Sequence, residues 1–357
     1  MSALNFVVVL FVAQILWAVA VRWSLKKIDC RREFSCRTAF EGESGELVEV
    51  VRNNGCVPIP WLRVESYISS GIRLGRQENL HVSSETFYSS CFTLMPYQQI
   101  RRRHYVRFMR RGVYDLGNAT FTVGDLLGWT RFWGEQQLSS PVTVYPRIME
   151  ADELPFPISE NLGMLITKRQ LLSDPFMVRS IRPYQPGDLI RDIHWQATAR
   201  TEEVQVRVHD TTVCPRLLVV VNAQGTDEQW DNYVHEGFAP VLEEQIRLAA
   251  SMCVLGLRSG LSAGFAVNMP RQRNGGSTVL MPKEGAAWEE TLLEAFAQLQ
   301  THCSEKFIAL LESLQSCRDM DILVISAYCS KGMERAMDKL RQSGNQVTFY
   351  NMEGGGQ

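Results

Sequence analysis

An uncharged segment near the N-terminus constrains this chain more than any other feature of its sequence. Residues 3–21 read ALNFVVVLFVAQILWAVAV and contain no charged side chain. A helix rises by about 1.5 Å per residue, so this segment spans roughly 28 Å, close to the thickness of a bilayer core. No second uncharged segment of this length follows. The sequence therefore predicts a single transmembrane helix at residues 3–21.

The charges that flank this segment predict its orientation. A cleaved signal peptide is the alternative, because residues 18–20 resemble a small-x-small cleavage site, but no Lys or Arg precedes the apolar segment. Five basic residues follow it within eleven positions: Arg22, Lys26, Lys27, Arg31 and Arg32. Such flanks stay on the cytoplasmic side. We therefore expect a single-pass protein of the cell (inner) membrane, with its N-terminus outside and the bulk of the chain in the cytoplasm.

Composition excludes several classes of protein. The 357 residues are enough for two or three domains, and 45% hydrophobic with 21% charged residues excludes a disordered chain or a multi-span transporter. The 37 basic and 39 acidic residues leave no global positive charge, so we expect no nucleic-acid partner. The nine cysteines form no CxxC pair, which favours free thiols in a reducing compartment over a zinc site.

Residues 28–150 alternate with a period near two and predict a β-rich domain. Residues 45–55 alternate and end in Asn-Asn-Gly, a turn signal, and 61–68, 85–95 and 103–117 also read as strands. Turn residues recur between these segments at short spacing. The pattern is typical of an antiparallel β-sandwich.

One part of this domain concentrates positive charge. Six arginines fall within eleven residues: Arg101, Arg102, Arg103, Arg107, Arg110 and Arg111. They could form a patch that binds phosphate or lipid headgroups. They could also belong to a solvated strand face on which the guanidinium groups pair with acids elsewhere.

The densest cluster of polar residues lies at 173–209. Its charged and aromatic members are Arg182, Tyr184, Asp188, Arg191, Asp192, His194, Trp195 and Arg200. Pro186 and Gly187 predict a type II turn, because Pro sets φ at its second position and Gly supplies a positive φ at its third. Asp188 could accept hydrogen bonds from N–H groups of that turn. Residues 204–208 alternate as a strand.

Three interpretations of this cluster stay open. Asp188, His194 and Arg200 could perform acid–base chemistry, although no nucleophile lies in a GxSxG-type elbow and Cys214 falls outside the cluster. The arginines could instead bind an anionic partner. They could also pair with the two aspartates, 188 and 192, as a structural lock between domains.

These residues resemble the signature of the domain of unknown function 58 family, whose members are bacterial and archaeal membrane-anchored proteins. The matching positions are Arg182, Tyr184, Gly187, Asp188, Arg191, Ile193, Trp195, Ala199 and Arg200. Upstream, Arg110-Arg111-Gly112, Tyr114, Leu116-Gly117, Asp125, Gly128 and Tyr145-Pro146 resemble the family's β-domain. Two features depart from the family: Gln196 replaces a basic residue, and the chain has one predicted membrane span where many members have two.

Residues 212–350 alternate between strand and helix patterns. The apolar run at 216–222 is typical of a buried parallel strand. Further strands are predicted at 263–269, 321–327 and 346–350, and helices at 236–259, 286–299, 305–315 and 331–344. The alternation predicts a doubly wound, mainly parallel sheet, in which ligands bind at the carboxyl ends of the strands.

By resemblance, this last part looks like a von Willebrand factor A-like domain. Such domains can hold Mg²⁺ through Asp-x-Ser-x-Ser after the first strand, because this cation prefers oxygen ligands and at least one carboxylate. The aligned positions here are Asn222, Gln224 and Thr226, which lack the carboxylate, and Asp227 is out of register. No GxGxxG follows Val221 either. We therefore expect neither a metal nor a cofactor.

Together these features predict a chain of five parts. They are a transmembrane helix at 3–21, a β-rich domain at 28–150, a linker and signature segment at 151–211, an α/β domain at 212–350 and a flexible tail at 351–357.

The predicted function is non-enzymatic and works through protein–protein contacts. Family members are often encoded beside MoxR-type AAA+ ATPases and transglutaminase-like membrane proteins, so the resemblance implies a membrane-anchored scaffold or assembly factor with such partners. The predicted contact residues are Arg182, Tyr184, Gly187, Asp188, Arg191, Trp195 and Arg200. The alternatives are a hydrolytic enzyme using Asp188, His194 and Arg200, which needs a nucleophile beside His194, and a metal-dependent ligand-binding domain.

Overall fold

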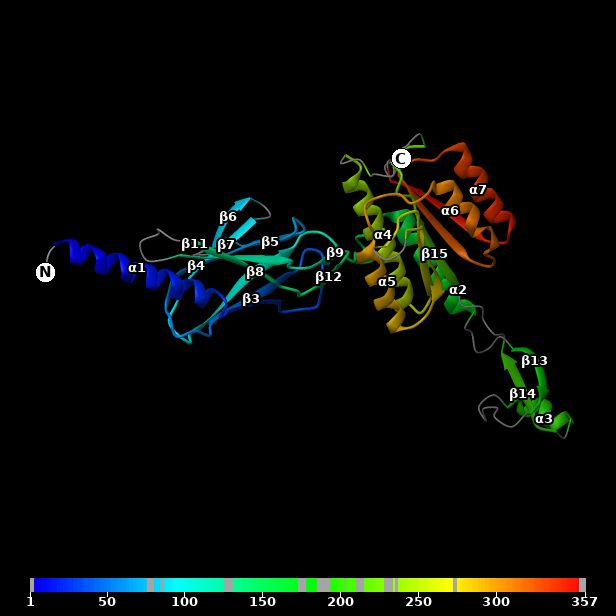
Figure 1. Cartoon of the computed structure of the whole chain (residues 1–357). Coiled ribbons are helices and arrows are strands. Elements are labelled where there is room, and N and C mark those ends of the chain that lie inside the picture. The colour runs from blue at the N-terminus through cyan, green and yellow to red at the C-terminus, as the bar shows by residue number, and fades with distance from the viewer. Residues whose placement is uncertain are drawn as a thin grey trace. The chain divides into compact units, whose positions relative to one another are not determined.

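The computed structural model describes residues 3–75, 80–84, 87–124, 131–172, 178–184, 193–201, 203–209, 215–227, 234, 237–271 and 275–352. The chain divides into two compact units. The first unit contains Met1–Arg147, and the second contains Ile148–Ala295 and Leu299–Gln357. Figure 1 shows the helices and strands of both units along the chain.

The first unit opens with a long helix, α1 (Ala3–Leu25), which contains the predicted span at 3–21. Many of its described apolar side chains are exposed: Val8, Val9, Phe11, Val12, Ile15, Leu16, Val19 and Trp23. Among the residues that the structure describes, no helix combines the length and the apolar character of a membrane span. The transmembrane helix therefore stays a prediction.

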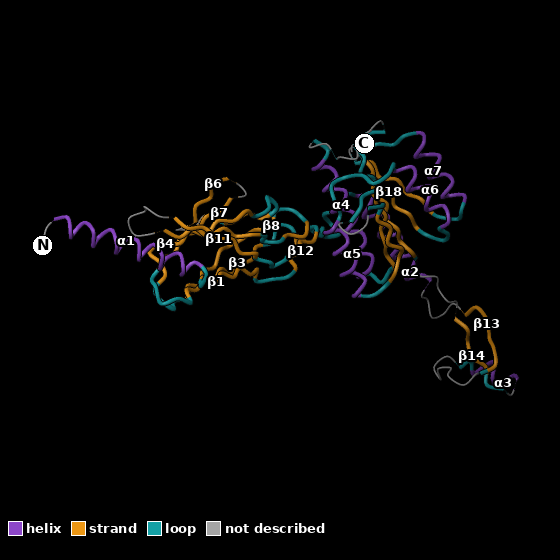
Figure 2. Tube along the Cα trace, viewed as in Figure 1, coloured by secondary structure: helices purple, strands orange, loops and turns teal. Residues whose placement is uncertain are grey.

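The rest of the first unit is built from β-strands (Figure 2). One antiparallel sheet has, in spatial order, β1 (Ile28–Phe34), β3 (Ser44–Asn53), β8 (Gln99–Phe108) and β5 (Ile72–Leu74). A second antiparallel sheet has β11 (Arg131–Gln137), β10 (Asn118–Gly124), β4 (Ile59–Tyr67), β7 (Phe87–Leu94) and β6 (Leu80–Ser84). A small third sheet has β2 (Thr38–Phe40), β12 (Val142–Tyr145) and β9 (Gly112–Tyr114).

The core of this unit follows from the alternation of its strands. Successive side chains of a strand point to opposite faces of its sheet. In β8, Val106 and Phe108 are buried, whereas Arg101 and Arg107 on the other face are exposed. The buried side chains of both large sheets belong to one hydrophobic cluster, which includes Leu47, Val51, Leu62, Val64, Phe92, Val106 and Phe108.

The second unit contains a five-stranded mixed sheet. Its order is β17 (Thr278–Lys283), β16 (Ser262–Val267), β15 (Arg216–Val221), β18 (Asp321–Ser326) and β19 (Gln346–Asn351). Neighbouring strands are parallel, except that β17 runs antiparallel to β16. The central strand β15 carries five consecutive buried residues, because both faces of the sheet are covered.

The helices of this unit are α2 (Phe156–Leu172), α3 (Trp195–Thr201), α4 (Ala239–Arg258), α5 (Ala286–Gln298), α6 (Phe307–Ser313) and α7 (Lys331–Gln342). Leu218 and Val220 of β15 pack in one cluster with residues of α6 and α7. Helix α4 covers the opposite face, where a Cβ added to Gly256 would lie 3.5 Å from Cδ2 of Leu217 (Figure 1). A separate antiparallel hairpin, β13 (Val178–Pro183) and β14 (Gln205–His209), accompanies α3.

Three elements differ from the sequence predictions. The strand predicted at 103–117 is wrong in extent, because the chain leaves the sheet after Phe108 and re-enters another as β9. The helix α2 lies within 151–211, for which the sequence predicted only a linker and the signature. Strand β17 was not predicted from the sequence; it contains Pro282, which is tolerated because β17 is an edge strand.

Candidate functional site

The described part of the signature segment forms a hairpin with a short helix at its end. Pro183 pairs with Gln205 across β13 and β14, and Ile193 adds an isolated bridge to Val206. The N–H of Tyr184 donates to the carbonyl of Val204 at 2.8 Å, which extends the pairing beyond Pro183. These main-chain hydrogen bonds therefore fix the backbone positions of the flanking side chains. Gly187, Asp188 and Arg191 lie outside the described residues, as does Asp192.

The described signature side chains face solvent. Trp195 is 67% exposed and Tyr184 is 42% exposed, while Arg200 is also exposed. Two apolar neighbours, Ile181 and Val204, are 45% and 44% exposed. Exposed aromatic and aliphatic side chains are typical of a contact surface. We call these five residues the hairpin surface.

Arg182 and His194 have structural roles in the same hairpin. The Nη1 of Arg182 donates to the carbonyl of Pro183 at 3.1 Å. The Nδ1 of His194 accepts a hydrogen bond from the N–H of Ala197 at 3.0 Å, and its carbonyl accepts one from Thr198. His194 therefore caps the N-terminus of α3. The hydrogen bond from Ala197 occupies the Nδ1 of His194.

The carboxyl ends of the central parallel strands carry a buried network of amides. The Nδ2 of Asn222 donates to the Oγ of Ser326 at 2.9 Å, and its Oδ1 accepts from the N–H of Gln224 at 3.0 Å. The Oε1 of Gln224 accepts from the N–H of Phe307 at 2.7 Å, and the Oδ1 of Asn268 accepts from Ala223 at 2.8 Å. These side chains hold the loops that follow β15, β16 and β18.

This network does not fit a divalent cation. Asn222, Asn268 and Ser326 are fully buried, and the amide oxygens accept main-chain hydrogen bonds instead of facing an open space. Thr226 and Asp227, by contrast, are exposed. Among the residues that the structure describes, no three His, Cys, Asp or Glu side chains gather as metal ligands.

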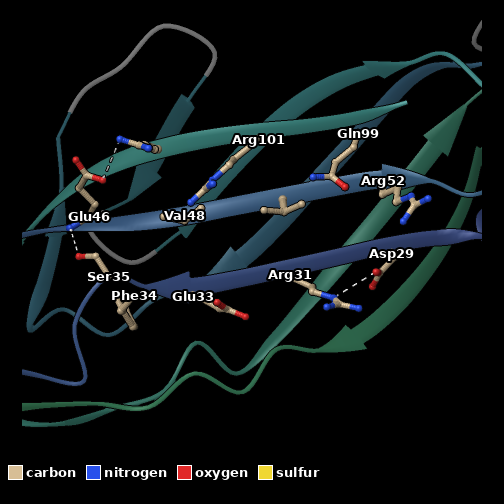
Figure 3. Close-up of a pocket in the computed structure, with 12 residues that line it drawn as sticks. Asp29, Arg31, Glu33, Phe34, Ser35, Glu46, Val48, Arg52, Gln99 and Arg101 are labelled. Carbon is tan, nitrogen blue, oxygen red and sulfur yellow. Dashed lines mark hydrogen bonds and ion pairs between the residues drawn. The ribbon is translucent and has the colours of Figure 1, made fainter. Parts of the chain in front are cut away.

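The arginine-rich strand β8 contributes to a groove on the exposed face of the four-stranded sheet. The groove has a volume of about 630 Å³, and β1 and β3 form the rest of it. Figure 3 shows its side chains on one face of the sheet, with a dashed line joining Arg31 to Asp29. Its basic residues are Arg31, Arg52, Arg101 and Arg103. We call it the arginine groove.

The remaining members of the arginine run occupy other environments. Arg102 is half-buried, with its guanidinium carbon 4.0 Å from the centre of the Phe92 ring. Arg111 is buried, and Arg107 and Arg110 border a second groove of about 830 Å³ beside β5. The run is therefore not one patch, because successive side chains of a strand alternate between two faces.

A buried ionic cluster lies inside the β-rich unit. The Nη2 of Arg32 is 2.5 Å from Oε1 of Glu49, and Nε2 of His104 is 3.2 Å from the other carboxylate oxygen. Arg32 also donates to the Oγ of Ser66. Burial alone would raise the pKa of Glu49, but Arg32 and His104 hold that pKa below its usual value.

The sequence analysis missed this cluster. Arg32 lies two residues after the buried Cys30 in β1 and therefore on the same face of the strand. The alternation of the sequence thus predicts that its side chain points inward. Its partner Glu49 lies on the inward face of β3, between Leu47 and Val51. Charged residues at inward positions of two strands were the signal, since buried charges are found paired.

The fold and these surfaces define a protein that combines an antiparallel β-rich unit with an α/β unit bearing a solvent-exposed hairpin. Residues 180–348 match the family model described as "Protein of unknown function DUF58". The resemblance to the domain of unknown function 58 family is thus confirmed for the signature hairpin and most of the α/β unit. No curated protein matches the sequence.

Several solved structures show local similarity to this chain. The CARDB domain of a Pyrococcus furiosus protein is 18% identical over 33% of this chain and 93% of its own, with a TM-score of 0.22. Escherichia coli alpha-2-macroglobulin is 12% identical over 33% of this chain and 13% of its own, with a TM-score of 0.27. An Archaeoglobus fulgidus non-cellulosomal cohesin is 8% identical over 35% and 94%, with a TM-score of 0.22.

Proposed function

We propose that this chain is a membrane-anchored, non-enzymatic protein that acts through protein–protein contacts. The observation that carries the proposal is the hairpin surface, on which Trp195 and Tyr184 are exposed within the family's signature. Tryptophan and tyrosine are the residues that most often dominate binding energy at protein interfaces. The capping role of His194 supports contact over catalysis, because it ties this side chain to α3.

Membrane anchoring is the second part of the proposal. It is supported by the uncharged residues 3–21, by the basic residues that follow them, and by the exposed apolar side chains of α1. The bulk of the chain would then lie in the cytoplasm. The eight cysteines that the structure describes are all free, which agrees with a reducing compartment.

The partners form the third part. A MoxR-type AAA+ ATPase and a transglutaminase-like membrane protein are proposed, on the resemblance to the domain of unknown function 58 family alone. The α/β unit would serve as a von Willebrand factor A-like domain without its metal, a proposal supported by the parallel strands β16, β15, β18 and β19 and by the buried amide of Asn222.

A cross-linked pull-down from detergent-solubilised membranes tests this proposal. The full chain is compared with Trp195→Ala and with Trp133→Ala, a matched control because Trp133 is 72% exposed on β11 of the other unit. We expect the ATPase to be captured by the wild type and by Trp133→Ala, and to be lost with Trp195→Ala while the melting curve stays unchanged. Equal capture by all three proteins would contradict a contact role for the hairpin surface.

A further inference from the structure

The register of three strands places the basic side chains of the arginine groove around one apolar residue. Val50 of β3 lies opposite Arg31 of β1 on one side and opposite Arg101 of β8 on the other. Arg52 lies two residues further along β3, on the same face. Side chains directly opposite or diagonal across a sheet lie about 5–8 Å apart at Cβ, which is within reach of arginine. Three arginine side chains, each ending in a guanidinium group, therefore start around Val50.

The carboxylates of the groove leave two of these guanidinium groups without a partner. Asp29 lies opposite Arg52 in the register, but its carboxylate is paired with Arg31 at 3.3 Å, and Glu46 is 3.9 Å from Arg103. The third carboxylate, Glu33, lies one row away opposite Val48. Within the part of the chain that the structure describes, neither Arg52 nor Arg101 has an ion-pair partner.

The groove holds four arginines against three carboxylates, so one positive charge is in excess, and like charges this close repel one another. An anion that lies over Val50 would remove this repulsion. Arginine is suited to that task, because its planar guanidinium forms paired hydrogen bonds with phosphate oxygens. The half-buried Val48 and Val50 form an apolar floor beneath the charged groups.

We propose that the arginine groove binds a phosphate group, and that this phosphate belongs to an anionic lipid headgroup. Arg52 and Arg101 would hold the phosphate oxygens, with Arg31 beside them. The lipid source rests on the proposed membrane anchor. Helix α1 ends at Leu25 and Arg31 follows six residues later, so the groove begins within about 20 Å of chain from the helix end.

Titration of the full chain in a nonionic detergent tests the site. Isothermal titration calorimetry compares short-chain phosphatidylglycerol with short-chain phosphatidylcholine and with inorganic phosphate. We expect saturable binding of phosphatidylglycerol, which weakens as salt rises, and no saturation with the other two. Equal binding of phosphatidylcholine, whose phosphate is offset by its choline cation, would overturn the selection of an anionic lipid headgroup. Equal binding of inorganic phosphate would keep the site but overturn the lipid source.

Matched variants locate the binding. Arg52→Gln combined with Arg101→Gln should weaken phosphatidylglycerol binding at least tenfold. Arg63→Gln combined with Arg131→Gln removes two exposed arginines from the other large sheet. This control should change the affinity for phosphatidylglycerol less than twofold. Glu33→Gln removes a competing negative charge and should strengthen binding. Thermal melts followed by circular dichroism are the control that each variant is folded.

An unchanged affinity in the Arg52/Arg101 double variant would overturn the assignment of the site. This result is separable from a failure of the proposed function, because the titration contains no partner protein. Capture of the ATPase depends in turn on Trp195, which lies in the hairpin surface of the second unit. A chain that loses lipid binding and still captures its partner would show that the two surfaces are independent.

Discussion

At the scale of single residues, the buried carboxylate of Glu49 makes the stability of the β-rich unit depend on pH. Its pKa is held below the ordinary value of about 4.3, because Arg32 and His104 outweigh the effect of burial. Because this pKa is lowered, the ionised Glu49 stabilises the fold at pH values above the ordinary pKa. This contribution is lost as the pH falls through the lower pKa of the folded state. We expect the free energy of unfolding of the wild type to decrease at pH values below about 4. Urea titrations from pH 7 to pH 3 measure it, and Glu49→Gln should flatten this part of the profile.

The same cluster predicts a strong coupling between two residues. Arg32→Met leaves the carboxylate of Glu49 buried without its main partner, and removing one member of a buried pair costs about 3–5 kcal/mol. Adding Glu49→Leu should recover part of that loss, since coupled changes are not additive. Arg31→Met is the control, because its side chain is 70% exposed on the other face of β1. Urea denaturation of the wild type, Arg32→Met, Glu49→Leu and the double variant provides the cycle, and simple additivity would show that the pair is not coupled.

At the scale of elements, the sequence predicted strands well where one face is buried. The predicted strand at 61–68 corresponds to β4, because Leu62, Val64 and Ser66 alternate inward. The apolar run at 216–222 corresponds to β15, which is buried on both faces. The predicted end of a strand was wrong where the alternation continues beyond it, as it does after Phe108. A period of two in the sequence does not indicate where the chain leaves its sheet.

Strand β16 offers a test of close packing between elements. A Cβ added to Gly264 would collide with the main chain of Leu280 to Pro282 in β17, next to a register shift between the two strands. Gly264→Ala should therefore lower the free energy of unfolding by about 1–3 kcal/mol, the usual cost of overpacking. Gly276→Ala is the matched control, because an added Cβ there meets no atom within 4 Å. Thermal or urea unfolding compares the two, and equal stabilities would refute the close contact.

At the scale of the whole molecule, the candidate surfaces differ in how far the sequence predicts them. The hairpin surface was readable, because Tyr184 and Trp195 lie in one local signature. The arginine groove was not, because Arg31, Arg52 and Arg101 come from three strands that only the register brings together. Sequence periodicity assigns a face to each residue but does not assign the neighbouring strand.

The proposed topology of the whole molecule gives the last prediction. Cys91 is exposed on β7, so it can react wherever the reagent reaches the β-rich unit. If residues 3–21 anchor the chain with its bulk inside, an impermeant thiol reagent should label Cys91 only after the cells are opened. The protein should also remain in membranes washed with alkaline carbonate, and Cys91→Ser provides the control for labelling at this site. Efficient labelling of Cys91 in intact cells would show that the orientation is the opposite one. Release of the protein by carbonate would show that residues 3–21 do not anchor it.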